Sequence, residues 1–138
     1  MRRKLLVKTL LALSLVSAKA GAADGVAVIG HPSLTKIDAL TVERLFTGRA
    51  ISLGGVSVVA VNVAQGNAVR TRFLQAFVKR DEDSYTGYWL VSRYSGLGAP
   101  PKELANSAEV IKFVQSTPGA IGYIDEADIK PGMNVLLR

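Results

Sequence analysis

The sequence is poor in the residues that carry much of enzyme chemistry. In 138 residues it contains no cysteine and a single histidine, His31. The absence of cysteine excludes disulfides, a lipid-bearing cysteine and a thiol nucleophile. His31 lies in a Gly-His-Pro-Ser segment, which is typical of a turn. No group of residues stands out as a nucleophile with its base, so we expect no catalytic residue and a protein that is not an enzyme.

Long hydrophobic runs are also lacking, apart from one near the amino terminus. Residues 5–16 are mostly apolar, follow Met-Arg-Arg-Lys and precede a stretch of small residues. This order is typical of a secretory signal peptide, and the run is shorter than the about 20 residues that a membrane-spanning helix needs. We expect a signal peptide over residues 1–22, cleaved between Ala18 and Asp24. Residues 23–138 would then form one soluble periplasmic domain without stable membrane insertion.

An excess of positive charge is absent once the predicted signal peptide is set aside. The whole chain has 17 basic and 11 acidic residues and a formal net charge of +6. Five of the basic residues and none of the acidic ones lie in residues 1–22, which leaves 12 basic and 11 acidic residues in the rest. This near balance, without a basic cluster interleaved with aromatic residues, predicts no nucleic-acid partner.

The most informative stretch is residues 56–77, VSVVAVNVAQGNAVRTRFLQAF. It opens with five valines in eight residues, which predicts a strand over residues 56–63 that is covered on both faces. The chain then turns at Gln65-Gly66-Asn67. Beyond the turn, apolar residues recur with the period of a helix up to Phe77. The stretch therefore predicts a strand, a tight loop and a helix.

The start of this helix has the properties of an anion site. Backbone N–H groups at a helix start are unpaired, carry partial positive charge and point beyond the carboxyl end of the preceding strand. The first turns contain Arg70 and Arg72 but no acidic residue, the reverse of what the helix dipole favours. The alternative is that both arginines are simply solvated on the surface. The residues predicted to bind a small oxyanion here are Gly66, Asn67, Ala68 and Arg70.

A second glycine-rich loop, Ser95-Gly96-Leu97-Gly98, precedes two prolines. Open α/β sheets bind their ligands beyond the carboxyl ends of the strands. We therefore expect this loop to lie beside the first one, with Ser95 and Gly96 as further ligand-binding residues.

The rest of the chain alternates short apolar segments with helical patterns. Because helices separate the predicted strands, we expect an α/β fold with a mainly parallel sheet and helices on both faces. Further strands are predicted over residues 26–29, 120–124 and 134–137. Helices are predicted over residues 42–47 after a Thr41 cap, over residues 84–91, and from an Asn106 cap with Glu109 reaching back to about Ser116. The aromatic residues predicted to be buried are Phe73, Phe77, Trp89 and Phe113.

Four short motifs occur in order along the chain. They are Leu45-Phe46-x-Gly48, the strand–loop–helix of residues 62–73, Ser95-Gly96-x-Gly98-x-Pro-Pro, and Pro-Gly-Ala-Ile-Gly-Tyr at residues 118–123. Together they resemble the small phosphate-binding-protein-like family, relatives of the substrate-binding proteins of phosphate ABC transporters. The resemblance implies a periplasmic-binding-protein type 2 fold, of which this chain has the size of a single lobe. It also implies a small phosphate-like oxyanion as ligand, an ABC permease as partner, and no cofactor.

The resemblance places the site residues at the first loop. Gly66 and Arg70 match the family's pattern, and Asn67 stands where a serine is usual. Val63 stands where an arginine is common, and Gln65 replaces an acidic residue that accepts a hydrogen bond from protonated phosphate. Asn67 can donate through its amide, whereas the Val63 side chain donates nothing.

Two other interpretations stay open at this point. The first keeps the lobe but not the ligand site, which gives an envelope protein-interaction or regulatory module with a membrane or sensor partner. Val63 and Gln65 favour that alternative. The second takes Asp125, Glu126 and Asp128 as a calcium loop, but the segment lacks the alternating oxygen ligands and the glycine that such a loop requires. A solvated turn is the better prediction there, with no metal site.

Overall fold

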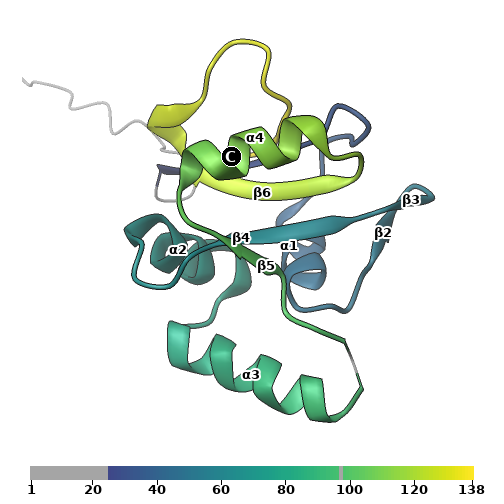
Figure 1. Cartoon of the computed structure of the whole chain (residues 1–138), viewed down its shortest axis with the longest axis vertical. Helices are drawn as coiled ribbons and strands as arrows, with labels where there is room; N and C mark the ends of the chain where they lie inside the picture. The colour runs from purple at the N-terminus through teal and green to yellow at the C-terminus, as the bar shows by residue number, and fades with distance from the viewer. Residues whose placement is uncertain (1–24, 97) are drawn as a thin grey trace, which may run out of the picture.

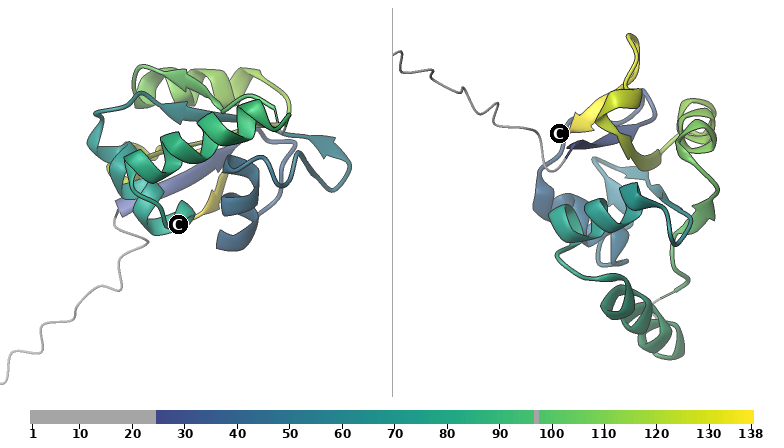
Figure 2. Two further views of the ribbon diagram at one scale, coloured as in Figure 1. Left: turned by 90° about the horizontal axis from the view of Figure 1, so that it is seen from below. Right: turned by 90° about the vertical axis from the view of Figure 1, so that its left-hand side faces the viewer.

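The computed structural model describes residues 25–96 and 98–138, which form a five-stranded sheet with helices on both faces (Figure 1). The predicted signal peptide lies outside the described residues. Helix α4 covers one face of the sheet, and α1, α2 and the π-helical turn η2 cover the other (Figure 2). The predicted α/β fold is confirmed. Among the described residues, none of the helices has the length and apolar character needed to cross a membrane.

The elements follow one another in the order β1, α1, β2, β3, β4, α2, η2, α3, β5, α4, β6, η3, β7. The strands are β1 (Val26–Gly30), β2 (Ser52–Leu53), β3 (Val56–Ser57), β4 (Val59–Val63), β5 (Lys102–Leu104), β6 (Ala120–Asp125) and β7 (Val135–Leu137). The helical elements are α1 (Ala39–Phe46), α2 (Ala68–Phe73), η2 (Leu74–Val78), α3 (Glu82–Tyr94), α4 (Ser107–Ser116) and the 3-10 turn η3 (Glu126–Asp128).

Four of the five strands in the main sheet run in the same direction. The strand order is β5-β4-β6-β1-β7, with β4 parallel to both β5 and β6. Strand β1 is antiparallel to β6 and to β7, so β7 points the same way as β6. The mainly parallel sheet is confirmed, but β1 is an exception that the alternation of helices did not predict. The connection from β1 to β4 contains the β2–β3 hairpin as well as α1. The rule that a single crossover helix joins two parallel strands therefore does not apply to it.

The valine-rich strand is shorter and less covered than its composition predicts. Its first residues form β3, which pairs with β2 in a hairpin that extends beyond the main sheet (Figure 1). In β4, Val61 and Val63 are fully buried, whereas Val59 is 40% exposed. Only the carboxyl half of β4 lies between two layers of helices, so the prediction of a strand covered along its whole length was wrong.

The centre of the core is a cluster of aromatic rings between the sheet and the α2 side. Phe73 is fully buried and stacks on Tyr123 with ring centroids 3.7 Å apart. Its ring also meets Phe46 edge-on at 4.7 Å and Phe77 at 5.5 Å. Burial of Phe73, Phe77 and Trp89 is thus confirmed, while Phe113 packs against the core but stays partly exposed.

Helix caps explain where the helices begin. Asn67 caps α2, which was not predicted, and Asn106 caps α4 with the Glu109 carboxylate reaching back to accept from the Ala105 N–H, which confirms the predicted cap there. Helix α1 begins earlier than expected, because the carboxylate of Asp38 accepts from the Thr41 N–H at 2.8 Å and so caps the helix. Thr41 therefore lies inside α1.

Helix α3 is longer than the predicted residues 84–91. The Asp81 carboxylate accepts from the Ser84 N–H at 2.7 Å and caps the helix, which continues through Gly87 to Tyr94. The helical penalty of a glycine is only about 1 kcal/mol. Burial of Tyr85 and Trp89 on the same side of the helix is large enough to offset it.

The hydroxyl of Tyr123 leads to a prediction about stability. It donates to Asn62 Oδ1 at 3.0 Å and accepts from the Val63 N–H at 3.1 Å, and both groups are buried. In Tyr123→Phe these two partners would lose their hydrogen bonds, which should lower the free energy of unfolding by about 1–3 kcal/mol in urea titrations. Tyr94→Phe is the control, because Tyr94 is 87% exposed. Equal stability of the two variants would contradict the prediction.

The same hydroxyl predicts how stability depends on pH. Burial raises the pKa of Tyr123 above its ordinary value, against a smaller lowering by the Val63 N–H and by Arg70. The unfolded chain has a tyrosine pKa of about 10. The stability due to the neutral hydroxyl is therefore complete below pH 10 and falls as the pH rises toward the folded value. In Tyr123→Phe this alkaline loss should be smaller.

Candidate functional site

The loop between β4 and α2 forms an exposed turn with free backbone donors. Asn67 caps the helix by accepting from the Val69 N–H through Oδ1 at 3.0 Å, which leaves its Nδ2 amide directed elsewhere. Gly66 has a φ of 86°, a conformation that suits glycine, and a Cβ there would meet no atom within 4 Å. Within the described residues, the N–H groups of Gly66 and Ala68 donate to no acceptor. The predicted helix start is therefore open to a ligand.

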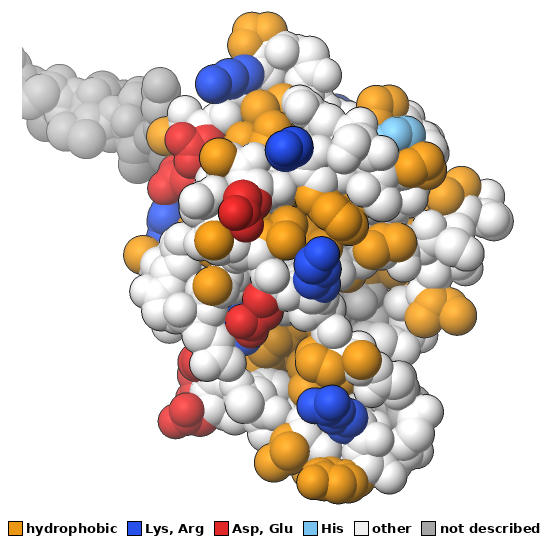
Figure 3. Space-filling view, in the orientation of Figure 1, with side chains coloured by type: hydrophobic (Ala, Val, Ile, Leu, Met, Phe, Trp, Pro, Cys, Tyr) orange, Lys and Arg blue, Asp and Glu red, His pale blue; other side chains and the backbone are white. Residues whose placement is uncertain are grey.

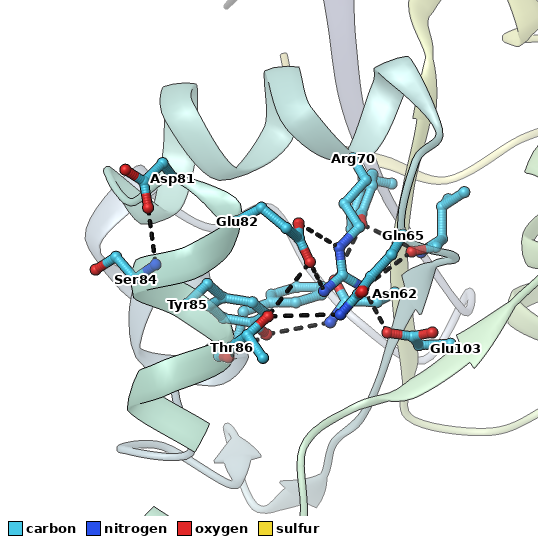
Figure 4. A network of polar contacts seen from close by, with 12 residues as sticks. Asn62, Gln65, Arg70, Asp81, Glu82, Ser84, Tyr85, Thr86 and Glu103 are labelled. Carbon is cyan, nitrogen blue, oxygen red and sulfur yellow. Dashed lines mark hydrogen bonds and ion pairs between the residues drawn. The ribbon is translucent and has the colours of Figure 1, made fainter. Parts of the chain in front are cut away.

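Arg70 does not extend toward solvent beside this turn. It is only 2% exposed, and its guanidinium lies under the turn between α2, α3 and β5 (Figure 4). Nε and Nη2 donate to the two carboxylate oxygens of Glu82 at 2.9 and 2.7 Å. Nη1 donates to Glu103 at 2.8 Å and to the carbonyl oxygen of Val63 at 3.1 Å. The arginine thus ties the end of β4 to the first turn of α3 and to β5.

The electrostatics of this cluster follow from the count of charges. Burial alone would lower the pKa of Arg70, but the carboxylates of Glu82 and Glu103 raise it, so the guanidinium stays charged. Two carboxylates face one guanidinium, which leaves the cluster with a net negative charge. Arg70 contributes little attraction for a further anion, because Glu82 already occupies the paired donors that would hold an oxyanion.

Arg72 has a different environment from Arg70. Its Nη2 donates to Asp125 at 2.8 Å in a pair whose side chains are 33% and 39% exposed. The hydrogen bond from Arg72 is the largest cause that lowers the pKa of Asp125. The alternative that both arginines are simply solvated is therefore wrong, most clearly for the buried Arg70.

The second glycine-rich loop lies at the opposite end of β4 from the turn. Helix α3 begins at Glu82, beside Arg70 and the carboxyl end of β4. Beyond the other end of α3, Gly98 lines a groove together with residues 58–60, at the amino end of β4. Ser95 and Gly96 follow α3 at that end (Figure 1). The structure therefore does not bring Ser95 and Gly96 together with Gly66 and Asn67, contrary to expectation.

A cleft of about 270 Å³ lies between α3 and the β4–β5 pair. Burial raises the pKa of Tyr85 in its wall, against smaller lowering effects of Asn62 and the nearby Trp89 indole. The Trp89 N–H itself makes no hydrogen bond of normal geometry in the described part of the chain. The cleft is lined among others by Asn62, Gln65, Tyr85, Trp89, Pro100 and Pro101. It is adjacent to the turn, because Gln65 belongs to both.

Sequence reasoning missed two residues that shape this region, Glu82 and Glu103. Glu82 lies in a run of three acidic residues directly before the predicted helix of residues 84–91, and Glu103 belongs to no motif of the sequence. Their partner Arg70 is 12 and 33 residues away in sequence. Residues 62–73 contain two arginines and no acidic residue. This imbalance is the only local sign that an arginine there takes its acidic partners from elsewhere in the chain.

The acidic segment at the end of β6 forms a short turn. Asp125 caps the 3-10 turn η3 by accepting from the Ala127 N–H at 3.1 Å, which makes this segment a turn. Among the described residues, no group of three or more histidine, cysteine or acidic side chains could hold a metal ion.

Comparison with solved structures gives the fold. A protein of Clostridium perfringens described as a phosphate ABC transporter substrate-binding protein, solved with bound phosphate, matches with a TM-score of 0.62 and 18% identity. An ABC-type phosphate transport receptor of Vibrio cholerae matches with a TM-score of 0.61 and 11% identity. PstS of Borrelia burgdorferi matches with a TM-score of 0.60 and 16% identity. The fold is that of part of a phosphate-transport binding protein.

The predicted family resemblance is confirmed at the level of the fold. The matches cover 81%, 81% and 82% of this chain but only 44%, 45% and 46% of the three structures. The chain thus spans less than half the length of each. No protein-family model and no curated protein sequence matches it.

Proposed function

We propose that this protein is an exported, single-lobe member of the solute-binding proteins that binds a small oxyanion, phosphate or sulfate, at the turn before α2. The observation that carries the proposal is the pair of exposed N–H donors at Gly66 and Ala68, at a helix start without acidic residues. Such donors carry partial positive charge and suit an oxyanion. Two of the three similar structures are named for phosphate transport, and one of these two was solved with bound phosphate.

Arg70 has a supporting role in this proposal. Its contact with the Val63 carbonyl fixes the end of β4, and hence the geometry of the turn, from below. Because Glu82 and Glu103 neutralise its charge, it adds little to affinity. With N–H donors on an exposed surface we expect a dissociation constant of about 1–10 mM, equivalent to about 3–4 kcal/mol. Tighter capture would require a partner that covers the turn.

The test is an NMR titration of the amide signals with phosphate, sulfate and chloride. We expect phosphate and sulfate to shift the signals of Gly66, Asn67 and Ala68, and to leave those of Ser95 and Gly96 in place. The matched variant is Asn67→Asp, because aspartate caps a helix as well as asparagine but adds a negative charge at the turn. It should keep the fold and abolish the shifts. Absence of any shift in the native protein at tens of millimolar anion would refute the proposal.

A second candidate is an interaction module that contacts an ABC permease or another protein of the cell envelope. The observation that favours it is the exposed apolar surface of α3, where Leu90, Val91 and Tyr94 are 57%, 66% and 87% exposed. This candidate does not require a ligand. It would be preferred if the anion titration fails while the apolar surface proves to be an interface.

A further inference from the structure

The cleft between α3 and the β4–β5 pair has features that oxyanion binding at the turn does not explain. Its volume is about 270 Å³, and its walls are mainly apolar. Tyr85, Trp89 and Arg93 line it from α3, and Pro100 and Pro101, which precede β5, line it from the other side. The three α3 residues span about 12 Å along the helix. Orange side chains gather between α3 and β5 in the space-filling view (Figure 3). The cleft therefore has the size of a site for a small organic molecule.

The two ends of the cleft differ in charge. At the end near the start of α3, Arg70 pairs with both Glu82 and Glu103, which leaves a net negative charge there. Arg93 lines the other end, in the last turn of α3, and is exposed. Among the described residues, its guanidinium has no hydrogen-bond or ion-pair partner. A ligand with one anionic group would therefore be oriented with that group at Arg93 and away from the two carboxylates.

A buried donor in the same wall makes no hydrogen bond of normal geometry. Trp89 is only 6% exposed, and its indole N–H has no acceptor in the described part of the chain. A buried donor without an acceptor is unfavourable, and a ligand that brings an acceptor removes this cost. Trp89 and Arg93 are four residues apart on one helix, so they are neighbours on the side that lines the cleft. Together they offer one neutral and one charged donor to a single acceptor group.

We propose that this cleft binds a small monocarboxylate with an apolar body. The carboxylate accepts from the Arg93 guanidinium and from the Trp89 N–H. The apolar body lies against Leu90, Pro100 and Pro101, which line the cleft. Leu90 is 57% exposed, so a ligand there removes apolar surface from water on both sides of the contact. The Trp89 nitrogen is covered in the structure, so the indole has to turn slightly toward the cleft to reach the carboxylate.

The charge of the cleft distinguishes a carboxylate from an inorganic oxyanion. One guanidinium balances one negative charge, and its planar fork matches the two oxygens of a carboxylate. A phosphate or sulfate dianion would carry a second charge toward apolar walls and toward the negative end of the cleft, where its loss of hydration is not repaid. The inference does not depend on oxyanion binding, because Arg93 and Trp89 take no part in the turn before α2.

The test is an NMR titration of the native protein with hexanoate at constant ionic strength. Trp89 is the single tryptophan, so its indole N–H gives one assignable signal. We expect hexanoate to move this signal with a dissociation constant of about 1 mM. Hexanamide, which lacks the charge, and acetate, which lacks the apolar body, should each bind at least about tenfold more weakly. Phosphate should leave the indole signal in place. An indole signal that does not respond to hexanoate, or that responds equally to hexanamide, would overturn the proposal.

Two arginine variants locate the carboxylate. Arg93→Gln removes the charge from an exposed side chain and should weaken hexanoate binding at least about tenfold. Arg44→Gln is the matched control, because Arg44 is also an exposed arginine in the last turn of a helix, α1, and does not line the cleft. It should bind hexanoate like the native protein. Circular dichroism checks that both variants are folded. Native affinity in Arg93→Gln, or an equal loss in both variants, would overturn the proposal.

Discussion

Replacing Phe73 with alanine is expected to lower the free energy of unfolding by about 3–5 kcal/mol. The side chain is fully buried and meets three other aromatic rings, with the Tyr123 ring only 3.7 Å away. Removing it leaves a cavity between the rings of Phe46, Phe77 and Tyr123, at the junction of α2, α1 and β6. For a domain of this size the melting temperature should fall by roughly 15–30 °C.

Urea denaturation followed by the fluorescence of the single tryptophan, Trp89, measures this change. Phe113→Ala is the matched control, because the same side chain is removed from a site that is only partly buried. We expect a loss of about 1–2 kcal/mol there. If the two variants lost the same stability, Phe73 would not be at the centre of the core.

Replacing Arg70 with alanine is expected to lower the free energy of unfolding by about 2–4 kcal/mol. The substitution removes four hydrogen bonds to Glu82, Glu103 and the Val63 carbonyl. It also leaves two carboxylates near each other without a counter-charge. The sequence alone predicts the opposite, namely that Arg70 faces solvent, binds the oxyanion and can be replaced without loss of the fold.

Two variants serve as controls for Arg70→Ala. Arg72→Ala should cost about 0–1 kcal/mol, since its pair with Asp125 is at least a third exposed. Arg70→Lys should restore little of the loss, because a single ammonium group cannot make the forked contact with Glu82. Stability of Arg70→Ala equal to that of the native protein would contradict the role assigned to this cluster.

The local features of the fold could be predicted from the sequence. The Asn106 cap depends on a hydrogen bond to a residue three positions away. The buried strands and the burial of Phe73 follow from the spacing of apolar residues. These are short-range properties, because helix geometry and strand alternation fix which neighbours in sequence share a face.

The composition of the site depended on contacts between distant segments. The sequence located an open turn at Gly66 and Ala68, and the structure agrees with that part. It also suggested an arginine for the ligand and a second loop beside the turn, and neither is where it was expected. Arg70 is held by Glu82 and Glu103, whose positions relative to it are set by the packing of α3 and β5.

What the sequence determined by itself is the place of strands β1, β4, β6 and β7, the burial of Phe73, Phe77 and Trp89, and a helix start with unpaired N–H groups. Tertiary structure decided the direction of β1, the distance between the two glycine-rich loops and the charge around Arg70. The physical reason is the distance in sequence between the residues that interact. A cap or an apolar period involves a few neighbouring residues, whereas the direction in which α3 runs depends on the burial of Tyr85 and Trp89 against elements far away in sequence. That direction places Ser95 and Gly96 at the end of β4 opposite the turn and leaves Leu90, Val91 and Tyr94 exposed.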